Sequence, residues 1–399
     1  MKVLVLSCNT GGGHNSCGKY IREELILNKI ECDFKNYFEI VNLSKTDFSN
    51  KIYVKSIGKK GGLFKYVYQI GDAYDKTKIV SPVYLVNKMF SNRLYNYIKK
   101  NNYDLVICPH LFPALALTAI NKKHRVNFMF VDTDYEYHPF TDEIQADYYV
   151  IPKELEERFV SRGVDKDKLL PFGIPISSEY IKNAKDMKNK LNIDKKMILI
   201  MLGSMGFGNI KTILNDLLNI EDACVTIVCG GNKKLYNELK KYDNKKLKVI
   251  GYSKNINDLI KSADIIISKP GGLSSTEIAS FRKGLIHVFP IPGVETGNTK
   301  YFSEHNLSFV ANSKEEILDY VNILLKNDDM RAQFLNMPEF YIDNILLLQN
   351  SLFEPFDKTL YSNICSQSSI HKLTYKNLHR NPYKSSFLTT LLNHTDLVL

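Results

Sequence analysis

Short apolar runs alternate with amphipathic stretches along most of the chain. In the first half, the apolar runs lie in MKVLVLS, YDLVICPH, VNFMFVDT and DYYVIP, and the stretches NSCGKYIREELILNK and PALALTAINKK have helical spacing. A buried strand followed by a helix and another buried strand is typical of a parallel sheet, because parallel neighbours need a long crossover connection. The pattern therefore predicts an α/β fold.

A second series of buried strands begins near residue 196, in KMILIMLGS, ACVTIVCGG, LKVIGYS, ADIIISK and GLIHVFP. The polar, proline-containing stretch FGIPISSEYIKNAKDMKNKLNIDKK separates the two series. A chain of 399 residues is also long enough for two cores. We therefore predict two doubly wound domains that face a central cleft. The predicted ranges are 1–175, a connection over 176–195, 196–353, and an accessory or poorly ordered tail over 354–399.

The loop KPGGLSSTE follows one of the predicted strands of the second series. Ligands of such sheets bind at the carboxyl ends of the strands, where this loop must lie. Gly271, Gly272 and Ser274 would open a helix N-terminus to a phosphate, and Glu277 could accept both hydroxyls of a ribose. Together these groups indicate a nucleoside diphosphate. The alternative is an ordinary capping box, in which Glu277 only closes the helix start.

Two further loops of the second series have similar chemistry. GSMGFGN places Gly203, Ser204 and Gly206 after a strand, which suits close approach to phosphates, although a tight turn has the same composition. It lacks a Walker lysine, which disfavours ATP hydrolysis. PIPGVETGNTKYF offers Glu295 and Asn298, whose carboxylate and amide suit sugar hydroxyls unless they are plain surface residues.

The stretch CNTGGGHNSCGKY follows the first strand. Read as GxGxxG, its last position is Ser16, so the dinucleotide fingerprint fails. Gly12 and Gly13 instead keep bulk away from His14, which is suited to take a proton from an alcohol. The alternative is a histidine that only caps or packs the helix start.

DTDYEYHPF brings carboxylates and an imidazole together after another strand. Asp132, Asp134 and His138 could form an acid/base pair or part of a metal site. The loop lacks HExxH spacing and a third convincing ligand, so we predict no metal.

Charge is concentrated in one segment. Residues 51–100 contain eleven Lys or Arg against two Asp, a difference of +9 in a chain whose formal net charge is +10. The same segment holds nine aromatic residues. Basic and aromatic side chains in one segment suit binding to an anionic membrane surface. The alternatives are a nucleic-acid-binding surface, which needs the same charges, and a basic face that is only exposed to solvent.

The cysteines and the apolar runs bear on location. The seven cysteines are scattered without CxxC spacing, which indicates reduced thiols and neither zinc ligands nor disulfides. The apolar start is too short for a signal peptide, and no run approaches the ~20 residues that span a bilayer. We therefore expect a cytoplasmic protein.

Taken in order, SCNTGGGH, TDYEYH, YYVIPKELEERFVSRGV, FGIPIS, GSMG, KPGGLSSTE and PGVETGNTKYF resemble the motifs of a known family. The chain resembles the glycolipid-forming GT-B glycosyltransferases of glycosyltransferase family 28, which include diacylglycerol glucosyltransferases and monogalactosyldiacylglycerol synthases. The resemblance implies two Rossmann-like domains and inverting, metal-independent transfer of a hexose from a UDP-sugar to diacylglycerol. It implies a peripheral enzyme at the cytoplasmic membrane face, with UDP-sugar as substrate and no cofactor.

The resemblance also implies roles for individual residues. His14 and Asp134 are the candidates for catalysis, while Gly12, Gly13, Tyr135 and His138 lie on the acceptor side. The UDP-sugar would contact Gly203, Ser204, Gly206, Tyr252, Gly271, Gly272, Ser274, Glu277, Glu295 and Asn298. In this setting the basic segment is expected to meet a membrane and not nucleic acid.

The chain departs from the family in lacking tryptophan, which usually follows TDYxxH; Pro139 and Phe140 stand there instead. The residues do not determine whether the donor sugar is glucose or galactose, how many sugars are added, or whether His14 or Asp134 is the base. Alternative functions are a polyprenyl-linked N-acetylglucosaminyltransferase, a UDP-sugar epimerase, or a non-catalytic UDP-sugar sensor.

Overall fold

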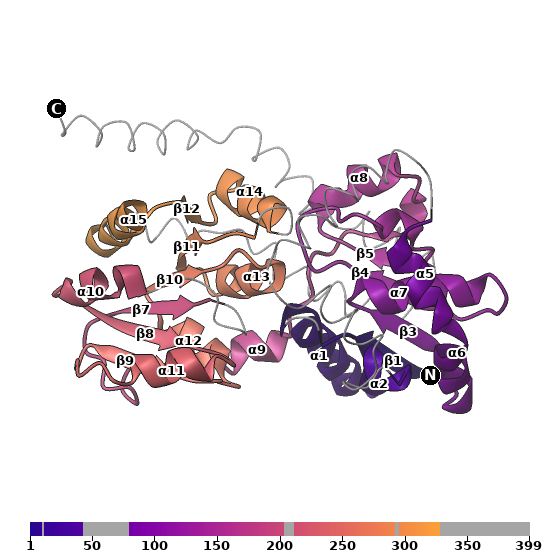
Figure 1. Ribbon diagram of the computed structural model, residues 1–399, viewed down its shortest axis with the longest axis horizontal. Coiled ribbons are helices and arrows are strands. Elements are labelled where there is room, and N and C mark those ends of the chain that lie inside the picture. The colour runs from indigo at the N-terminus through magenta and orange to yellow at the C-terminus, as the bar shows by residue number, and fades with distance from the viewer. Residues whose placement is uncertain (10–11, 43–79, 203–210, 292–294, 328–399) are drawn as a thin grey trace. The chain divides into compact units, whose positions relative to one another are not determined.

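Two parallel six-stranded sheets organise the chain (Figure 1). The structure is a computed structural model and describes residues 1–9, 12–42, 80–202, 211–291 and 295–327. All of these residues belong to one compact unit, Met1–Leu347. The α/β fold class predicted from the alternation of strands and helices is confirmed.

The first sheet has the order β2-β1-β3-β4-β5-β6. Its strands are β1 (Lys2–Ser7), β2 (Glu31–Asn36), β3 (Leu105–Cys108), β4 (Phe128–Val131), β5 (Tyr148–Val150) and β6 (Leu169–Leu170). Its helices are α1 (Gly12–Leu27), α2 (Tyr37–Ile40), α5 (Pro82–Met89), α6 (Ser91–Lys100), α7 (Leu111–Asn121) and α8 (Glu156–Ser161). The strand order reverses between β1 and β3, so the loops after these two strands flank the switch point where ligands bind.

The second sheet has the order β12-β11-β10-β7-β8-β9. Its strands are β7 (Lys196–Met201), β8 (Ala223–Val228), β9 (Leu247–Ile250), β10 (Ile265–Ser268), β11 (Gly284–Val288) and β12 (Phe309–Ala311). Helices α9 (Ser178–Lys182), α10 (Lys211–Asn219), α11 (Lys233–Leu239), α12 (Ile256–Ser262), α13 (Gly272–Ser280), α14 (Thr296–Glu304) and α15 (Lys314–Lys326) accompany it. Here the order reverses between β7 and β10, which are followed by GSMG and KPGG.

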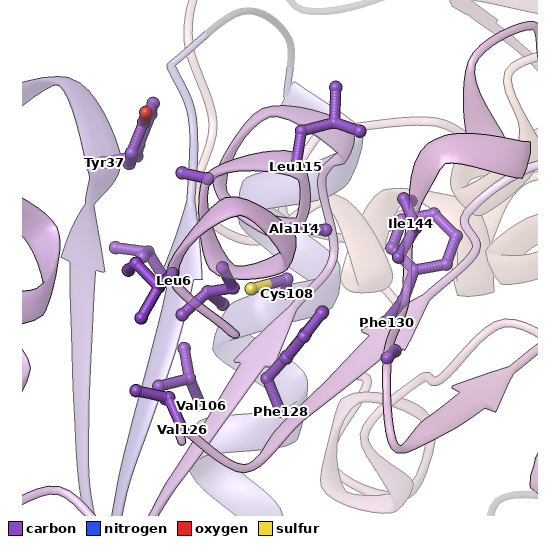
Figure 2. Close-up of a cluster of buried hydrophobic side chains, with 14 of the residues drawn as sticks. Leu6, Tyr37, Val106, Cys108, Ala114, Leu115, Val126, Phe128, Phe130 and Ile144 are labelled. Carbon is purple, nitrogen blue, oxygen red and sulfur yellow. The ribbon is translucent and has the colours of Figure 1, made fainter. Parts of the chain in front are cut away.

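The first sheet is covered by a continuous apolar core (Figure 2). Leu6, Val106 and Phe128 come from three neighbouring strands, and Ala114 and Leu115 of α7 pack against them. All five side chains are fully buried. This packing fixes the strand ends, and with them the loops that carry the predicted chemistry.

The predicted strands are all present, but three others were missed. β2 reads ECDFKN and buries only Cys32 fully, because it lies at a sheet edge and pairs with β1 alone. β6 has two residues, and β12 has three. Such short or polar edge strands lack the apolar run by which the other strands were predicted.

Candidate functional site

His14 lies at the start of α1, beside the loops that follow β3 and β4. Its Nδ1 is 2.8 Å from the Pro109 carbonyl oxygen and 2.9 Å from Thr133 Oγ1. The His110 ring packs edge to face against the His14 ring, with 4.6 Å between the ring centroids. Since a carbonyl can only accept, Nδ1 carries the proton and donates it to Pro109. The neutral ring therefore presents an unprotonated Nε2, which is the form that a general base requires.

Burial lowers the pKa of His14, and His138 lowers it further, against opposing contributions from Asp134 and the Pro109 carbonyl. His14 is consequently neutral at pH 7. The nearby negative charge of Asp134 favours the imidazolium that would form when His14 takes a proton.

Asp134 forms an ion pair with His138, with 3.2 Å between Oδ2 and Nε2. Its other oxygen, Oδ1, accepts a hydrogen bond of 2.7 Å from Asn298 Nδ2. Burial alone would raise the pKa of Asp134, but His138, the protonated form of His14 and the Asn298 hydrogen bond together outweigh it and hold that pKa below its ordinary value. The pairing also raises the pKa of His138 despite its burial. Asp134 is thus an ionised carboxylate with both oxygens engaged.

Asp132 is buried just upstream of this pair. Burial raises the pKa of Asp132 to about 7, although His138 opposes the shift. Its Oδ1 accepts from the backbone amide of Asp134 at 3.3 Å. This hydrogen bond stabilises the turn of the loop, and the Asp132 side chain lies beside the Asp134–His138 ion pair.

The loop Thr133–Glu136 lies against the N-termini of α13 and α14. A Cβ atom on Gly272 would come within 2.0 Å of the Thr133 carbonyl oxygen, and one on Gly297 within 2.3 Å of Glu136 Cβ. Glu136 Oε2 accepts from the Gly297 amide at 2.7 Å. Both positions therefore need glycine for this close approach.

Tyr135 and Asn298 strengthen the same contact. Asn298 Oδ1 accepts from the Tyr135 amide at 2.6 Å, while the Tyr135 hydroxyl lies 3.1 Å from Thr276 Oγ1. The Tyr135 ring stacks on Tyr301 with the centroids 4.0 Å apart. Asn298, predicted to bind sugar, is fully buried in these contacts.

The predicted ribose residue Glu277 and sugar residue Glu295 are both held by other side chains. Glu277 Oε1 accepts from the Tyr20 hydroxyl at 2.5 Å. Burial raises the pKa of Glu277 to about 7, although the Tyr20 hydrogen bond lowers it. Glu295 pairs with buried Lys269 at 3.2 Å and accepts from the Ile291 amide at 2.8 Å.

The structure thus brings most of the predicted residues to one place. His14, Asp134, His138, Gly272 and Asn298 are linked through the contacts above, with Gly13 close to Leu273 at the start of α13. Gly12 is exposed at the start of α1, and Ser274 Oγ donates to the carbonyl of Gly271. Tyr252, predicted near the uracil, follows β9 and is 71% exposed.

Three predicted residues, Gly203, Ser204 and Gly206, lie outside the described residues, as do residues 51–79 of the basic segment and the tail. Conversely, the sequence did not single out Pro109, Thr133 or Tyr20. Pro109 and Thr133 each follow a strand end, which is a signal that could have found them. Tyr20 sits within α1 and has no such signal.

The described residues contain no group of three or more His, Cys, Asp or Glu side chains arranged to hold a metal ion. Six of the seven cysteines fall in the described ranges, and all six are buried and unbridged. No helix in the described part of the chain has the length and hydropathy to cross a membrane.

Solved structures define the class of the fold. The chain resembles MurG of Acinetobacter baumannii, with a TM-score of 0.54 and 16% identity over 88% of this chain and 99% of that one. It also resembles the spinosyn rhamnosyltransferase SpnG complexed with thymidine diphosphate, with a TM-score of 0.61 and 9% identity over 90% of this chain and 100% of that one. The two sheets and these likenesses identify a GT-B fold.

Sequence comparisons define the family. The monogalactosyldiacylglycerol (MGDG) synthase family matches residues 14–176, and the glycosyltransferase family 28 C-terminal domain matches residues 197–337. The family described as capsular polysaccharide synthesis protein matches residues 301–391.

Two relatives are named processive diacylglycerol beta-glucosyltransferase. The one from Bacillus subtilis (strain 168) is 30% identical over 86% of this chain and 92% of its own length. The one from Bacillus licheniformis is 30% identical over 82% of this chain and 87% of its own length. The chain belongs to glycosyltransferase family 28, in the group of glycolipid-forming enzymes that includes these relatives. The resemblance found in the motifs is thereby confirmed.

Proposed function

We propose that the protein transfers a hexose from a UDP-sugar to diacylglycerol, with inversion at the anomeric carbon and without a metal ion. The observation that carries the proposal is the state of His14: its Nδ1 is committed to the Pro109 carbonyl and its pKa is lowered by burial. The names of the curated relatives support diacylglycerol as acceptor and glucose as the transferred sugar. Glucose is therefore the donor sugar that we propose.

In this reaction His14 Nε2 takes the proton from the acceptor hydroxyl. The alcohol oxygen then attacks the anomeric carbon, while the bond from that carbon to the diphosphate breaks and UDP leaves with the electron pair. A single displacement of this kind inverts the configuration. Asp134 remains ionised and stabilises the imidazolium of His14.

The leaving UDP needs a cationic or dipolar partner. Gly271 is the N-cap of α13 and Gly272 is its first residue, and the backbone amides of a helix start carry roughly half a positive charge. Glu277 lies further along the same helix, and we assign it the role of accepting the ribose hydroxyls. The amides at the start of α13 would supply the stabilisation that a metal ion supplies elsewhere, which supports metal independence.

The acceptor is a membrane lipid, so we also propose that the protein docks on the cytoplasmic face of a membrane. Leu85 and Met89 of α5 are 49% and 78% exposed, and they are four residues apart on the helix. Lys88 of α5 and Arg93, Lys99 and Lys100 of α6 add positive charge to the same segment. Apolar anchors beside basic residues favour binding to an anionic bilayer.

The test is an assay of purified protein with diacylglycerol in anionic vesicles and UDP-glucose, UDP-galactose or UDP-N-acetylglucosamine as donor. We expect UDP release and a glucolipid from UDP-glucose, with a β linkage, and an unchanged rate in the presence of a chelator. No glycolipid from any donor would refute the transferase proposal. UDP-sugar binding without turnover would favour a sensor. In a parallel assay in which a polyprenyl-linked acceptor replaces diacylglycerol, transfer to that acceptor alone would favour a polyprenyl-linked N-acetylglucosaminyltransferase.

A further inference from the structure

A tyrosine outside the predicted site binds the predicted ribose residue. The Tyr20 hydroxyl of α1 donates to Glu277 Oε1 of α13 at 2.5 Å. Glu277 is 7% exposed, so this hydrogen bond lies in a nearly dry environment. Hydroxyl-to-carboxylate bonds of this length belong to the strong, charge-assisted class. The orientation of the carboxylate is therefore tied to α1.

The same helix carries the proposed base. His14 lies in the first turn of α1, and Tyr20 follows six residues later. The start of α1 approaches α13 closely, since a Cβ atom on Gly13 would lie 3.8 Å from Leu273 Cβ. One helix thus contacts the acceptor side through His14 and the donor side through Tyr20.

Resting on the proposed function, we propose that Tyr20 is a positioning residue for the donor nucleotide. Its hydroxyl holds the Glu277 carboxylate in the orientation in which the remaining lone pairs accept the ribose hydroxyls of the UDP-sugar. A carboxylate offers about four acceptor positions, and Tyr20 occupies one of them. Tyr20 does not touch the reacting atoms, so its effect should appear in donor binding.

The charge of Glu277 depends on this hydrogen bond. The other titratable groups that face Glu277 are Cys17 of α1 and Tyr180 of α9, and burial raises the pKa of both thiol and phenol. Both are neutral at pH 7 and supply no charge. Burial raises the pKa of Glu277 to about 7, and the Tyr20 bond lowers it. Removing the hydroxyl should raise that pKa further, which leaves Glu277 protonated and a poorer acceptor.

The experiment is calorimetric titration of UDP and of 2′-deoxy-UDP into the full-length protein and its variants between pH 6 and 9. Tyr20→Phe should weaken UDP binding about tenfold at pH 7, which corresponds to the loss of one hydrogen bond to a charged group. It should weaken 2′-deoxy-UDP binding much less, because one of the two ribose hydroxyls is already missing. The pH midpoint of UDP binding should move upward.

Two further variants separate the possible causes. Tyr84→Phe is the matched control, because the buried Tyr84 hydroxyl has no hydrogen-bond partner among the described residues, and it should bind UDP like the wild type. Glu277→Ala tests the ribose assignment itself and should weaken UDP binding at least as much as Tyr20→Phe.

The outcomes distinguish this proposal from the proposed function. If Glu277→Ala weakens UDP binding while Tyr20→Phe binds like the wild type or more tightly, the role of Tyr20 is refuted and the ribose site stands. An equal loss for UDP and 2′-deoxy-UDP in Tyr20→Phe indicates damage to the fold and also refutes it. If the wild type binds no UDP, or Glu277→Ala is without effect, the proposed donor site fails and Tyr20 loses its role with it.

Discussion

At the scale of single residues, a backbone carbonyl decides what His14 can do. The Pro109 oxygen accepts from Nδ1, so the tautomer with a basic Nε2 is the one present. Asp134 is engaged by His138 and Asn298, which supports a role in electrostatic stabilisation and leaves the proton transfer to His14. This assignment answers, as a proposal, the choice between the two residues that the sequence left open.

Replacing His14 tests the assignment directly. His14→Ala should lower kcat with diacylglycerol by about 10²- to 10⁴-fold, the usual contribution of a general base, while the affinity for UDP stays unchanged. In the wild type, kcat at saturating UDP-sugar should fall only when the pH drops below about 6.5, because the pKa of His14 is lowered from that value, whereas kcat/KM also reports the ionisation of Glu277 near pH 7. Steady-state rates from pH 5 to 9 check both expectations.

The control for this variant is His124→Ala. His124 is exposed on the same half of the chain and stacks on Tyr95, away from the site. Its removal should leave the pH profile unchanged. A His14→Ala rate within threefold of the wild type would show that another group takes the proton, and Asp134→Asn would then be the next variant to measure.

The sequence predicted His14 because its chemistry is local: a histidine flanked by glycines follows a buried strand. It could not predict the partners of Asp134 and Glu277, since Asn298 and Tyr20 are 164 and 257 residues away along the chain. Those contacts depend on how two sheets and their helices approach each other. A single sequence has no local pattern that encodes this approach.

At the scale of elements, helix α1 is held against its sheet by a glycine. A Cβ atom on Gly18 would lie 2.8 Å from Phe34 Cε2 and 3.1 Å from Val5 Cγ1, which is closer than the packing allows. Gly18 belongs to the stretch CNTGGGHNSCGKY, in which the dinucleotide fingerprint fails, and it packs closely between helix and sheet. The site depends on this packing because α1 carries both His14 and Tyr20.

Gly18→Ala should therefore destabilise the protein by about 1–3 kcal/mol, the usual cost of overpacking a core. The gain of about 1 kcal/mol from better helix propensity opposes this cost, so the control for propensity is Gly13→Ala, at an exposed position of the same helix where a Cβ atom meets nothing closer than 3.8 Å. Urea unfolding followed by circular dichroism measures both. A Gly18→Ala protein that is more stable than the wild type by about 1 kcal/mol, the full propensity gain, would contradict the tight packing.

Helix α13 is tied to its sheet by a buried histidine that plays no part in the proposed reaction. His287 of β11 lies 2.9 Å from Ser275 Oγ through Nε2 and 3.0 Å from Ser308 Oγ through Nδ1. Burial lowers the pKa of His287 to about 3, so the ring is neutral, donating from one nitrogen and accepting at the other.

This histidine should make stability depend on pH. In the unfolded chain a histidine binds a proton below about pH 6.5, whereas His287 in the folded chain stays neutral down to about pH 3. The free energy of unfolding should thus fall between these values by about 1.4 kcal/mol per pH unit. His287→Gln keeps a donor and an acceptor without titrating, so its stability relative to the wild type should improve as the pH is lowered from 7 to 4.5. Parallel pH profiles in urea unfolding would contradict this.

The long apolar strands and the helices between them could be predicted because each has its own periodic signal. β1 and β8 are buried over nearly their whole length, so their sequences are continuous apolar runs. β2 and β6 could not be predicted, because an edge strand is stabilised by its neighbour's backbone and needs few apolar side chains.

At the scale of the whole molecule, charge and exposed apolar groups must work together if the acceptor stays in a bilayer. Residues 51–100 carry a charge difference of +9 in a chain of net charge +10. Electrostatic attraction of this kind is screened by salt, with a Debye length of about 8 Å at physiological ionic strength. Apolar side chains that enter the bilayer are needed for binding that persists in salt.

Met89 and Leu85 are the described side chains best placed for that role, since both project from α5 within the basic segment. Met89→Asp should weaken binding to anionic vesicles about tenfold or more, because burying a methionine contributes roughly 1.5–3 kcal/mol. Turnover of vesicle-borne diacylglycerol should fall in parallel, and UDP affinity should not change. Leu27→Asp is the matched control, because Leu27 is 58% exposed at the end of α1 and lies outside the basic segment. Vesicle sedimentation at 0.15 M salt and the turnover assay together test this prediction. Equal losses of vesicle binding in Met89→Asp and Leu27→Asp, or no loss in either variant, would exclude α5 as the membrane anchor.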